Sequence, residues 1–297
     1  MELKRGDMSW SCGIIGLPNS GKSTIFNALT ALTVPCQSYP FCTIEPNVGI
    51  VAVPDDRLAR LSETLKPEKV TSTTIEFIDV AGLIKGAHKG EGLGNRFLSH
   101  IRNVDAIAHV IRCFETENVP HVYAEIDPKR DVEIVETEII VSDLEIVEER
   151  LAKLERLAKV SKEKGVKEIE LLARIKSTLE QGSFIAMDYF DHSDAEIVRT
   201  FNLITTKPIF YVANIDEETL EKLPISDLEE LVRSKNSRLV YICGKLEHDL
   251  INLSPHERTS YMDLYGMTEM SIESVIKVGY EAQDLITNFN YTFYRHL

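Results

Sequence analysis

The stretch GLPNSGKST, residues 16–24, decides the fold of this chain. It matches the pattern G-x-x-x-x-G-K-[ST], in which glycines allow a tight turn whose backbone N–H groups point at phosphate oxygens. The apolar run Cys12–Leu17 leads into it and predicts a buried strand, and the pattern of Lys22–Ala31 predicts a helix. A helix N-terminus adds the positive end of a dipole to such a turn. The sequence therefore predicts a P-loop, a phosphate-binding loop between a strand and a helix.

Each polar side chain of this loop has an expected role. The ammonium group of Lys22 would reach the β- and γ-phosphates of a nucleotide, and the hydroxyl of Ser23 would bind Mg²⁺. The nucleotide-binding residues predicted in the loop are Asn19, Ser20, Gly21, Lys22, Ser23 and Thr24.

Two later segments add to this site. The strand expected over Thr74–Val80 leads into the pattern D-x-x-G, formed by Asp79 and Gly82. After a P-loop, this Asp holds Mg²⁺ directly or through water, and the Gly offers its N–H to the γ-phosphate. Thr43 lies in the loop before the second strand, where its hydroxyl would complete the magnesium shell; an ordinary loop threonine is the alternative. The predicted metal ligands are Ser23, Thr43 and Asp79.

The segment after Asp79 is rich in glycine, with five between residues 82 and 94. We expect such a loop to change conformation with the nucleotide state. Many GTPases place a water-orienting Gln directly after the D-x-x-G glycine. Here that residue is Leu83, which has no polar side-chain atom. Hydrolysis must therefore use another group or be slow.

Outside these motifs, strand-like and helix-like patterns alternate along the chain. Such alternation predicts an α/β fold, with a mostly parallel sheet and helices on both faces. The other expected strands are Val48–Val53, Ala106–Cys113, Pro208–Ala213 and Arg238–Cys243. The other expected helices are Asp56–Thr64, Asn95–Asn103, Ser226–Ser234 and Ser271–Asn288.

Residues 130–176 differ in kind, because they are rich in Glu, Lys, Leu, Ile and Val and almost free of Gly and Pro. Apolar residues at spacings of three and four predict a coiled-coil seam. The predicted seam consists of Leu144, Val147, Leu151, Leu154, Ala158, Ile169, Leu172, Ile175 and Leu179. We expect two antiparallel helices joined around Gly165 and inserted into one α/β domain. The charged residues here are interpreted as a solvated helical face.

The base site is predicted after the strand Pro208–Ala213. GTPases of this layout read guanine with N-K-x-D, whose Asp accepts two hydrogen bonds from the base. This chain has Asn214-Ile215-Asp216-Glu217, so the Lys is absent and Glu replaces the Asp. Misplaced hydrogen-bonding groups lower selectivity steeply, so the sequence points away from strict GTP specificity. Cys243, in Cys243-Gly244-Lys245, is similar to the S-A-K loop that also contacts the base.

Composition narrows the class of protein further. The 297 residues include 33 Lys and Arg against 47 Asp and Glu, and the net charge of −14 argues against binding to nucleic acid by bulk positive charge. Five scattered cysteines without a C-x-x-C pair argue against a disulfide framework or a zinc site and favour a reducing cytoplasm. The sequence shows no signal-peptide pattern and no apolar run of about 18 residues, so we expect neither secretion nor a membrane span.

The combined motifs resemble those of the YchF/Obg-like ATPases, a branch of the Obg family of translation-factor-type P-loop NTPases. The matching stretches are GLPNSGKST (16–24), PFCTIEPN (40–47), DVAGLIKGAHKGEGLGNRFL (79–98), HVIRCFE (109–115) and NIDE (214–217). The resemblance runs from about residue 11 to about residue 288. It implies a Mg²⁺-dependent hydrolase that prefers ATP to GTP and acts as a ribosome-associated switch in the cytoplasm. It implies neither a membrane nor a specific DNA partner.

The resemblance also assigns individual residues. Its purine and metal contacts fall on Asn214, Ile215, Glu217, Ser23 and Thr43. The water-positioning histidine, which takes the place of Gln, falls on His121. A neutral imidazole orients a water molecule well near pH 7. A polar loop residue without a catalytic role is the alternative, and His88 in the glycine-rich loop is a second candidate.

The expected domain limits complete this description. Residues 11–127 and 205–280 form the two parts of the G domain, and residues 128–204 form the coiled-coil insertion. Residues 281–297 are interpreted as the remnant of a truncated C-terminal TGS domain, whose loss would weaken contact with the ribosome. Two alternatives stay open, namely a GTP-binding regulatory switch with negligible intrinsic hydrolysis and a non-functional truncated chain.

Overall fold

A computed structural model of the chain describes residues 10–32, 47–67, 69–80, 93–116, 119–158, 165–216, 225–264, 267 and 269–282. These residues form one six-stranded sheet with the strand order β2-β3-β1-β4-β5-β6. The strands are β1 (Trp10–Ile15), β2 (Val48–Ala52), β3 (Thr74–Asp79), β4 (Ala106–Cys113), β5 (Ile209–Ile215) and β6 (Leu239–Ile242). All neighbouring pairs are parallel except β2 and β3, so the predicted mostly parallel sheet is confirmed.

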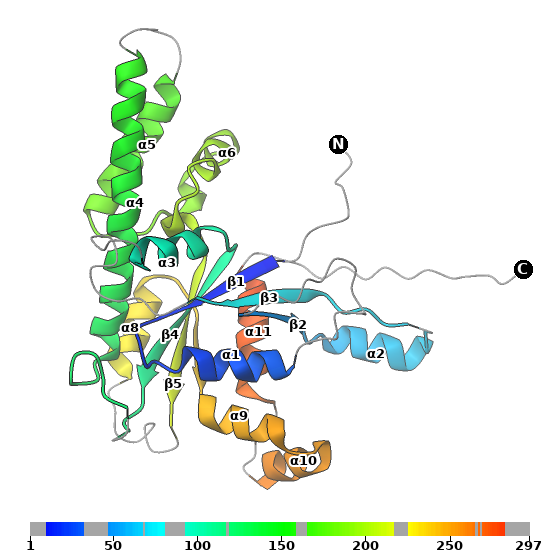
Figure 1. The fold of residues 1–297 in the computed structure, drawn as a ribbon. Coiled ribbons are helices and arrows are strands. Elements are labelled where there is room, and N and C mark those ends of the chain that lie inside the picture. Colours follow the sequence, from blue (N-terminus) through cyan, green and yellow to red (C-terminus); the bar gives the residue numbers. More distant parts are fainter. Residues whose placement is uncertain are drawn as a thin grey trace, which may run out of the picture.

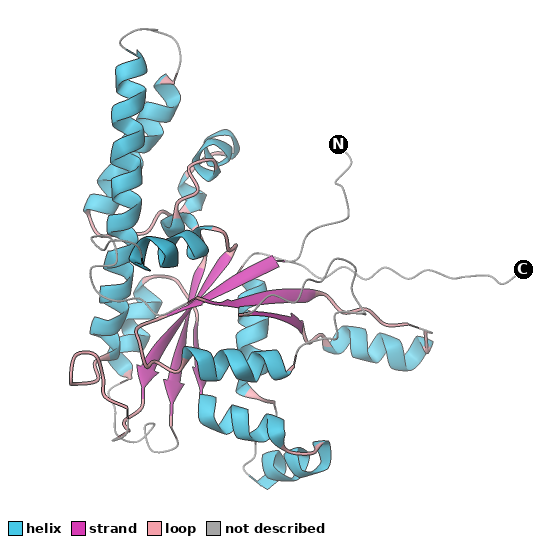
Figure 2. Ribbon diagram, in the orientation of Figure 1, coloured by secondary structure: helices cyan, strands magenta, loops and turns pink. Residues whose placement is uncertain are grey.

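Helices cover both faces of this sheet (Figures 1 and 2). One face packs against α1 (Lys22–Ala31), α9 (Gly244–Asn252) and α11 (Ser271–Glu281). The other packs against α3 (Leu93–Arg102), α4 (Pro128–Ala158) and α8 (Ser226–Ser234). Side chains of a strand alternate between faces, so the strands other than β2 supply both cores.

Most predicted elements are present, with small shifts at their ends. The limits of α1, α8 and β4 are those expected from the sequence, and α2 (Asp56–Leu65) is one residue longer than expected. The helices α6 (His192–Arg199), α9 and α10 (Pro255–Leu264) were not predicted. The strand expected to end at Ala213 continues to Ile215, because Asn214 and Ile215 pair with Arg112 and Cys113 of β4. Asn214 therefore lies within the sheet rather than in a loop.

The helices α4 and α5 (Val166–Glu180) form a hairpin that extends beyond the sheet (Figure 1). Val147, Leu172, Ile175 and Leu179 are buried in its apolar core. The other predicted seam residues of α4 down to Leu154 pack against this core from half-buried positions. The predicted turn before Gly165 lies outside the described residues, as does the chain beyond residue 282.

The first half of α4 is fastened to the sheet domain by buried carboxylates. Glu136 accepts a hydrogen bond from Tyr211 of β5. It also forms an ion pair with Lys235, with 2.7 Å between Lys235 Nζ and Glu136 Oε2. Asp143, which is fully buried, pairs with Arg102 of α3 at 2.7 Å. The interpretation of the charges in this helix as a solvated face is therefore wrong for these residues. Removing one partner of a buried ion pair strongly lowers the stability of the fold, so these pairs hold the first half of α4 on the sheet domain.

No helix among the described residues is long and apolar enough to cross a membrane.

Candidate nucleotide-binding site

The P-loop connects β1 to α1, and Lys22 is the first residue of that helix. Its side chain is buried, and Nζ donates a hydrogen bond to the backbone carbonyl of Leu17 at 2.8 Å. The residue before it, Gly21, cannot cap the helix with a side chain, and the first turn of α1 contains no acidic residue. The unpaired N–H groups of a helix N-terminus favour an anion. This end of α1 is therefore suited to bind phosphate.

Burial changes the protonation of Lys22. Desolvation lowers the pKa of its ammonium group to about 8, and the nearby carboxylate of Asp79 only partly opposes this effect. A bound phosphate would add negative charge and raise that pKa again. Nucleotide binding should therefore be coupled to proton uptake above neutral pH.

We expect the affinity for a nucleoside triphosphate to fall as the pH rises through 8, by up to about tenfold per pH unit, because the free site loses the Lys22 proton that the bound site retains. Isothermal titration calorimetry at pH 8.5, in two buffers with different ionisation enthalpies, should show proton uptake. The variant Lys22→Met serves as the control and should lose the uptake. Equal binding enthalpies in both buffers for the unaltered chain would contradict this assignment.

The side chain of Asn214 connects the P-loop to the start of α9. Its Nδ2 donates to the carbonyl of Ser20, and its Oδ1 accepts from the N–H of Gly244, both at 3.0 Å. Gly21 approaches so closely, with a φ of +92°, that a Cβ there would lie 2.0 Å from Asn214 Nδ2. The amide of Asn214 thus holds two loops together, and its predicted contact with the base stays a prediction.

The predicted metal site is partly described. Ser23 Oγ lies 3.2 Å from Oδ2 of Asp79, the last residue of β3. Burial raises the pKa of Asp79, while Ser23 and Lys22 oppose this shift. Two oxygen donors thus face one another beside the P-loop, and they are the residues here that would hold a hard cation such as Mg²⁺. Thr43 and Gly82 lie outside the described residues.

His121 lies in the loop between β4 and α4. Its Nε2 is 2.8 Å from Oδ2 of Asp131, and its Nδ1 accepts the N–H of Tyr123 at 3.2 Å. The preceding carbonyl, that of Pro120, accepts from Nδ2 of Asn19 in the P-loop at 3.2 Å. The loop therefore contacts the phosphate site, while the imidazole itself is engaged with protein groups. Its role in positioning water stays a prediction.

Two buried residues that hold this loop were not assigned from the sequence. Arg112 of β4 donates from Nη2 to the carbonyl of Val119 at 2.8 Å, and Asp131 binds His121. Arg112 lies within the matched stretch HVIRCFE, but the sequence pattern gave neither residue a role, because Val119 and His121 lie outside β4 and α4.

The base side of the site is described only in part. Ile215 is the last residue of β5, and Cys243 immediately precedes α9, next to the Gly244 N–H that Asn214 holds. Thr24 is half-buried in the first turn of α1. Glu217 and the glycine-rich loop with Leu83 and His88 lie outside the described residues.

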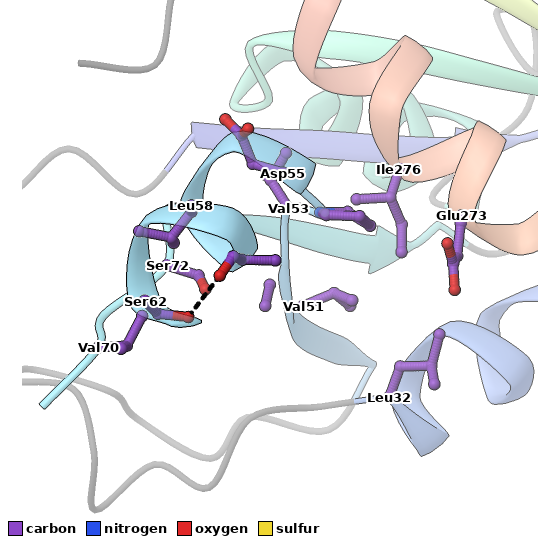
Figure 3. Close-up of a pocket in the computed structure, with 13 residues that line it drawn as sticks. Leu32, Val51, Val53, Asp55, Leu58, Ser62, Val70, Ser72, Glu273 and Ile276 are labelled. Atoms are coloured by element: carbon purple, nitrogen blue, oxygen red, sulfur yellow. Dashed lines mark hydrogen bonds between the residues drawn. The ribbon is translucent and has the colours of Figure 1, made fainter. Parts of the chain in front are cut away.

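A separate hollow of about 390 Å³ lies between α2, β2 and α11 (Figure 3). Its lining is largely apolar, with Val51, Val53, Leu58 and Ile276 among the side chains that face it. It adjoins the C-terminal end of α1, at Leu32, and not the P-loop at the other end of that helix. It contributes no group to the phosphate site.

The sheet order, the P-loop between β1 and α1, and an Asp at the end of the neighbouring strand define a P-loop NTPase with a GTPase fold. Residues 11–144 match the family described as "50S ribosome-binding GTPase". "Ribosome-binding ATPase YchF" of Bacillus subtilis is 41% identical over 286 residues, which cover 95% of this chain and 78% of that protein. The protein of the same name from Haemophilus influenzae is 40% identical over 283 residues, with the same coverage.

A solved structure agrees with these relatives. The structure titled "Structure of the Schizosaccharomyces pombe YchF GTPase" superposes with a TM-score of 0.79 at 32% identity, over 94% of this chain and 77% of that chain. The chain belongs to the YchF family.

Proposed function

We propose that this chain binds ATP together with Mg²⁺ and hydrolyses the bond between the β- and γ-phosphates. The observation that carries the proposal is the arrangement of Lys22, Ser23 and Asp79 at the uncapped N-terminus of α1. The curated relatives are named ATPases, which supports ATP as the substrate. Ser23 and Asp79 are the described residues that would hold the metal, which would supply neutralisation of the charge on the phosphate oxygens.

The residues present suit this metal and its nucleotide. Ser23 and Asp79 supply hard oxygen donors 3.2 Å apart. Ser20 Oγ is buried and has no hydrogen-bond partner among the described residues, so a phosphate oxygen would satisfy it. The described residues contain no group of three or more His, Cys, Asp or Glu side chains that could hold a metal ion. We propose that Ser23 and Asp79, with Thr43, hold Mg²⁺ when the nucleotide is bound.

The chain's own groups would act by positioning and by neutralising charge, not by forming a covalent intermediate. Lys22 and the P-loop amides bind the phosphate oxygens and stabilise the charge that develops on them. His121 is the residue that we propose for positioning the attacking water, because Leu83 offers no polar atom there.

We expect ATP to bind at least about tenfold more tightly than GTP, because Glu217 in place of the guanine-binding Asp misplaces a pair of acceptors. Competition of unlabelled ATP and GTP against one fluorescent nucleotide, with Mg²⁺ present, measures this ratio directly. Restoring the guanine-reading pattern with Ile215→Lys and Glu217→Asp should move the preference toward GTP. Tenfold tighter binding of GTP by the unaltered chain would refute ATP as the substrate.

The proposed partner is the ribosome, as the names of the relatives suggest, and the cytoplasm is the proposed location. The hairpin of α4 and α5 offers a contact surface that projects from the nucleotide domain (Figure 1). We propose residues 128–204 as the insertion that carries this surface. The first half of α4 packs on the sheet, so a partner bound to the hairpin would be mechanically connected to the G domain.

A further inference from the structure

His121 is held in a conformation in which neither ring nitrogen is available to a water molecule. Its side chain is only 2% exposed. Because Nδ1 accepts the N–H of Tyr123, the ring proton lies on Nε2 and is donated to Asp131. A histidine that positions water needs one nitrogen facing the substrate, so these two bonds define a resting position.

Asp131 is positioned to keep the His121 imidazole in this conformation. It lies in the first turn of α4 and is 3% exposed. Its second oxygen, Oδ1, accepts from Nη2 of Arg130 at 3.0 Å, and the Arg130 guanidinium stacks over the ring of Tyr123 at 5.1 Å. The carboxylate would therefore keep a charged partner if the imidazole left, which lowers the cost of releasing it.

The loop that contains His121 also contacts the phosphate site. The carbonyl of Pro120 binds Asn19 of the P-loop, and that of Val119 binds Arg112 of β4. His121 thus lies between the P-loop and the first turn of α4. A small change in the distance between these two elements acts directly on the bond from His121 to Asp131.

We propose that Asp131 is a positioning residue that keeps His121 in a resting state, and that displacement of α4 frees the imidazole for the nucleotide site. The proposal rests on the proposed function of His121 in hydrolysis. The helix that carries Asp131 continues for 31 residues into the hairpin, so a partner bound to the hairpin acts on this bond through one continuous element. In the absence of a partner, Glu136 and Asp143 hold α4 in place, and turnover is slow.

The test is the steady-state ATPase activity of Asp131→Ala in the full chain, without ribosomes. We expect kcat to rise at least about threefold with KM changed less than about twofold, because the freed imidazole is populated more often. The double variant Asp131→Ala with His121→Ala should lose the increase. Asp105→Ala is the control, because it removes a carboxylate that lies outside α4 and binds Ser11 of β1, and it should not raise kcat.

A rise in rate is a result that a merely structural role of Asp131 would not produce. A kcat at or below that of the unaltered chain, an increase that survives in the double variant, or an equal increase in Asp105→Ala would overturn the proposal. If His121→Ala alone leaves kcat unchanged, the proposal also fails, while ATP hydrolysis measured in the same assay stands.

A second measurement applies even if Asp131→Ala does not fold. Nitrogen-15 NMR of the imidazole in the unaltered chain should show a proton on Nε2 and none on Nδ1. The conservative variant Asp131→Asn retains an oxygen acceptor without charge and should give a smaller rise in kcat. A ring protonated at Nδ1 in the unaltered chain would overturn the assigned contact.

Discussion

Lys22→Met is expected to weaken binding of ATP with Mg²⁺ by about 100-fold, which is about 2.7 kcal/mol. The ammonium group lies at the N-terminus of α1 within reach of the phosphates, and charge-assisted hydrogen bonds are the strong ones in such sites. Met retains the apolar volume of the side chain, so the lost affinity reports the charge. Fluorescent-nucleotide titration with Mg²⁺ at pH 7.5 measures the change.

The control for this variant is Lys277→Met. Lys277 is a cation on α11 that is paired with Glu269 away from the P-loop. Its substitution should change nucleotide affinity by less than about twofold, because a surface ion pair contributes little. Thermal unfolding should confirm that Lys22→Met folds cooperatively. If Lys22→Met binds ATP as tightly as the unaltered chain, the P-loop assignment is wrong.

Gly21→Ala is expected to damage both the fold and the site. The left-handed φ of +92° costs a side chain about 1–2 kcal/mol, and the new Cβ would lie 2.0 Å from Nδ2 of Asn214. Moving that amide breaks its hydrogen bonds to Ser20 and Gly244, and each buried group left unpaired costs about 1–3 kcal/mol. We expect a loss of about 3–8 kcal/mol in unfolding free energy. Nucleotide affinity should fall at least about tenfold, because the P-loop loses its shape.

The variant Gly182→Ala separates the cost of backbone strain from the cost of the steric clash with Asn214 that Gly21→Ala would cause. Gly182 also has a positive φ, of +73°, but a Cβ there would meet no atom within 4 Å. Its substitution should cost only the strain, about 1–2 kcal/mol, and leave nucleotide binding unchanged. Chemical denaturation of both variants, with binding titrations alongside, gives the comparison. Equal losses of stability in the two would show that the contact with Asn214 is unimportant.

Local sequence pattern was sufficient to predict the helices whose ends are marked by residues of the helix itself. The limits of α1 and α8 were correct because helical spacing and turn residues mark them in the chain itself. The end of β5 was placed too early, because Asn214 looks like a loop residue until its pairing with Arg112 of β4 is known. Partners across a sheet are not encoded in the local pattern.

The charged residues of α4 also show that local sequence pattern does not reveal contacts between distant segments. Asp131, Glu136 and Asp143 are indistinguishable in sequence from the solvated carboxylates around them, yet all three are buried. Their partners, His121, Tyr211 and Arg102, lie between 10 and 75 positions away in the chain. Only the packing of α4 on the sheet brings these groups together.

The sequence by itself determined the class of this protein, because a P-loop is a local motif whose glycines, lysine and helix start are contiguous in the chain. It also determined the order of the strands and of most helices along the chain, through the periodicity of apolar residues. The tertiary structure alone decided how the site is connected. Asn214 bonds the P-loop to α9, and Asp131 binds His121, because hydrogen bonds between distant segments depend on which surfaces fold against one another.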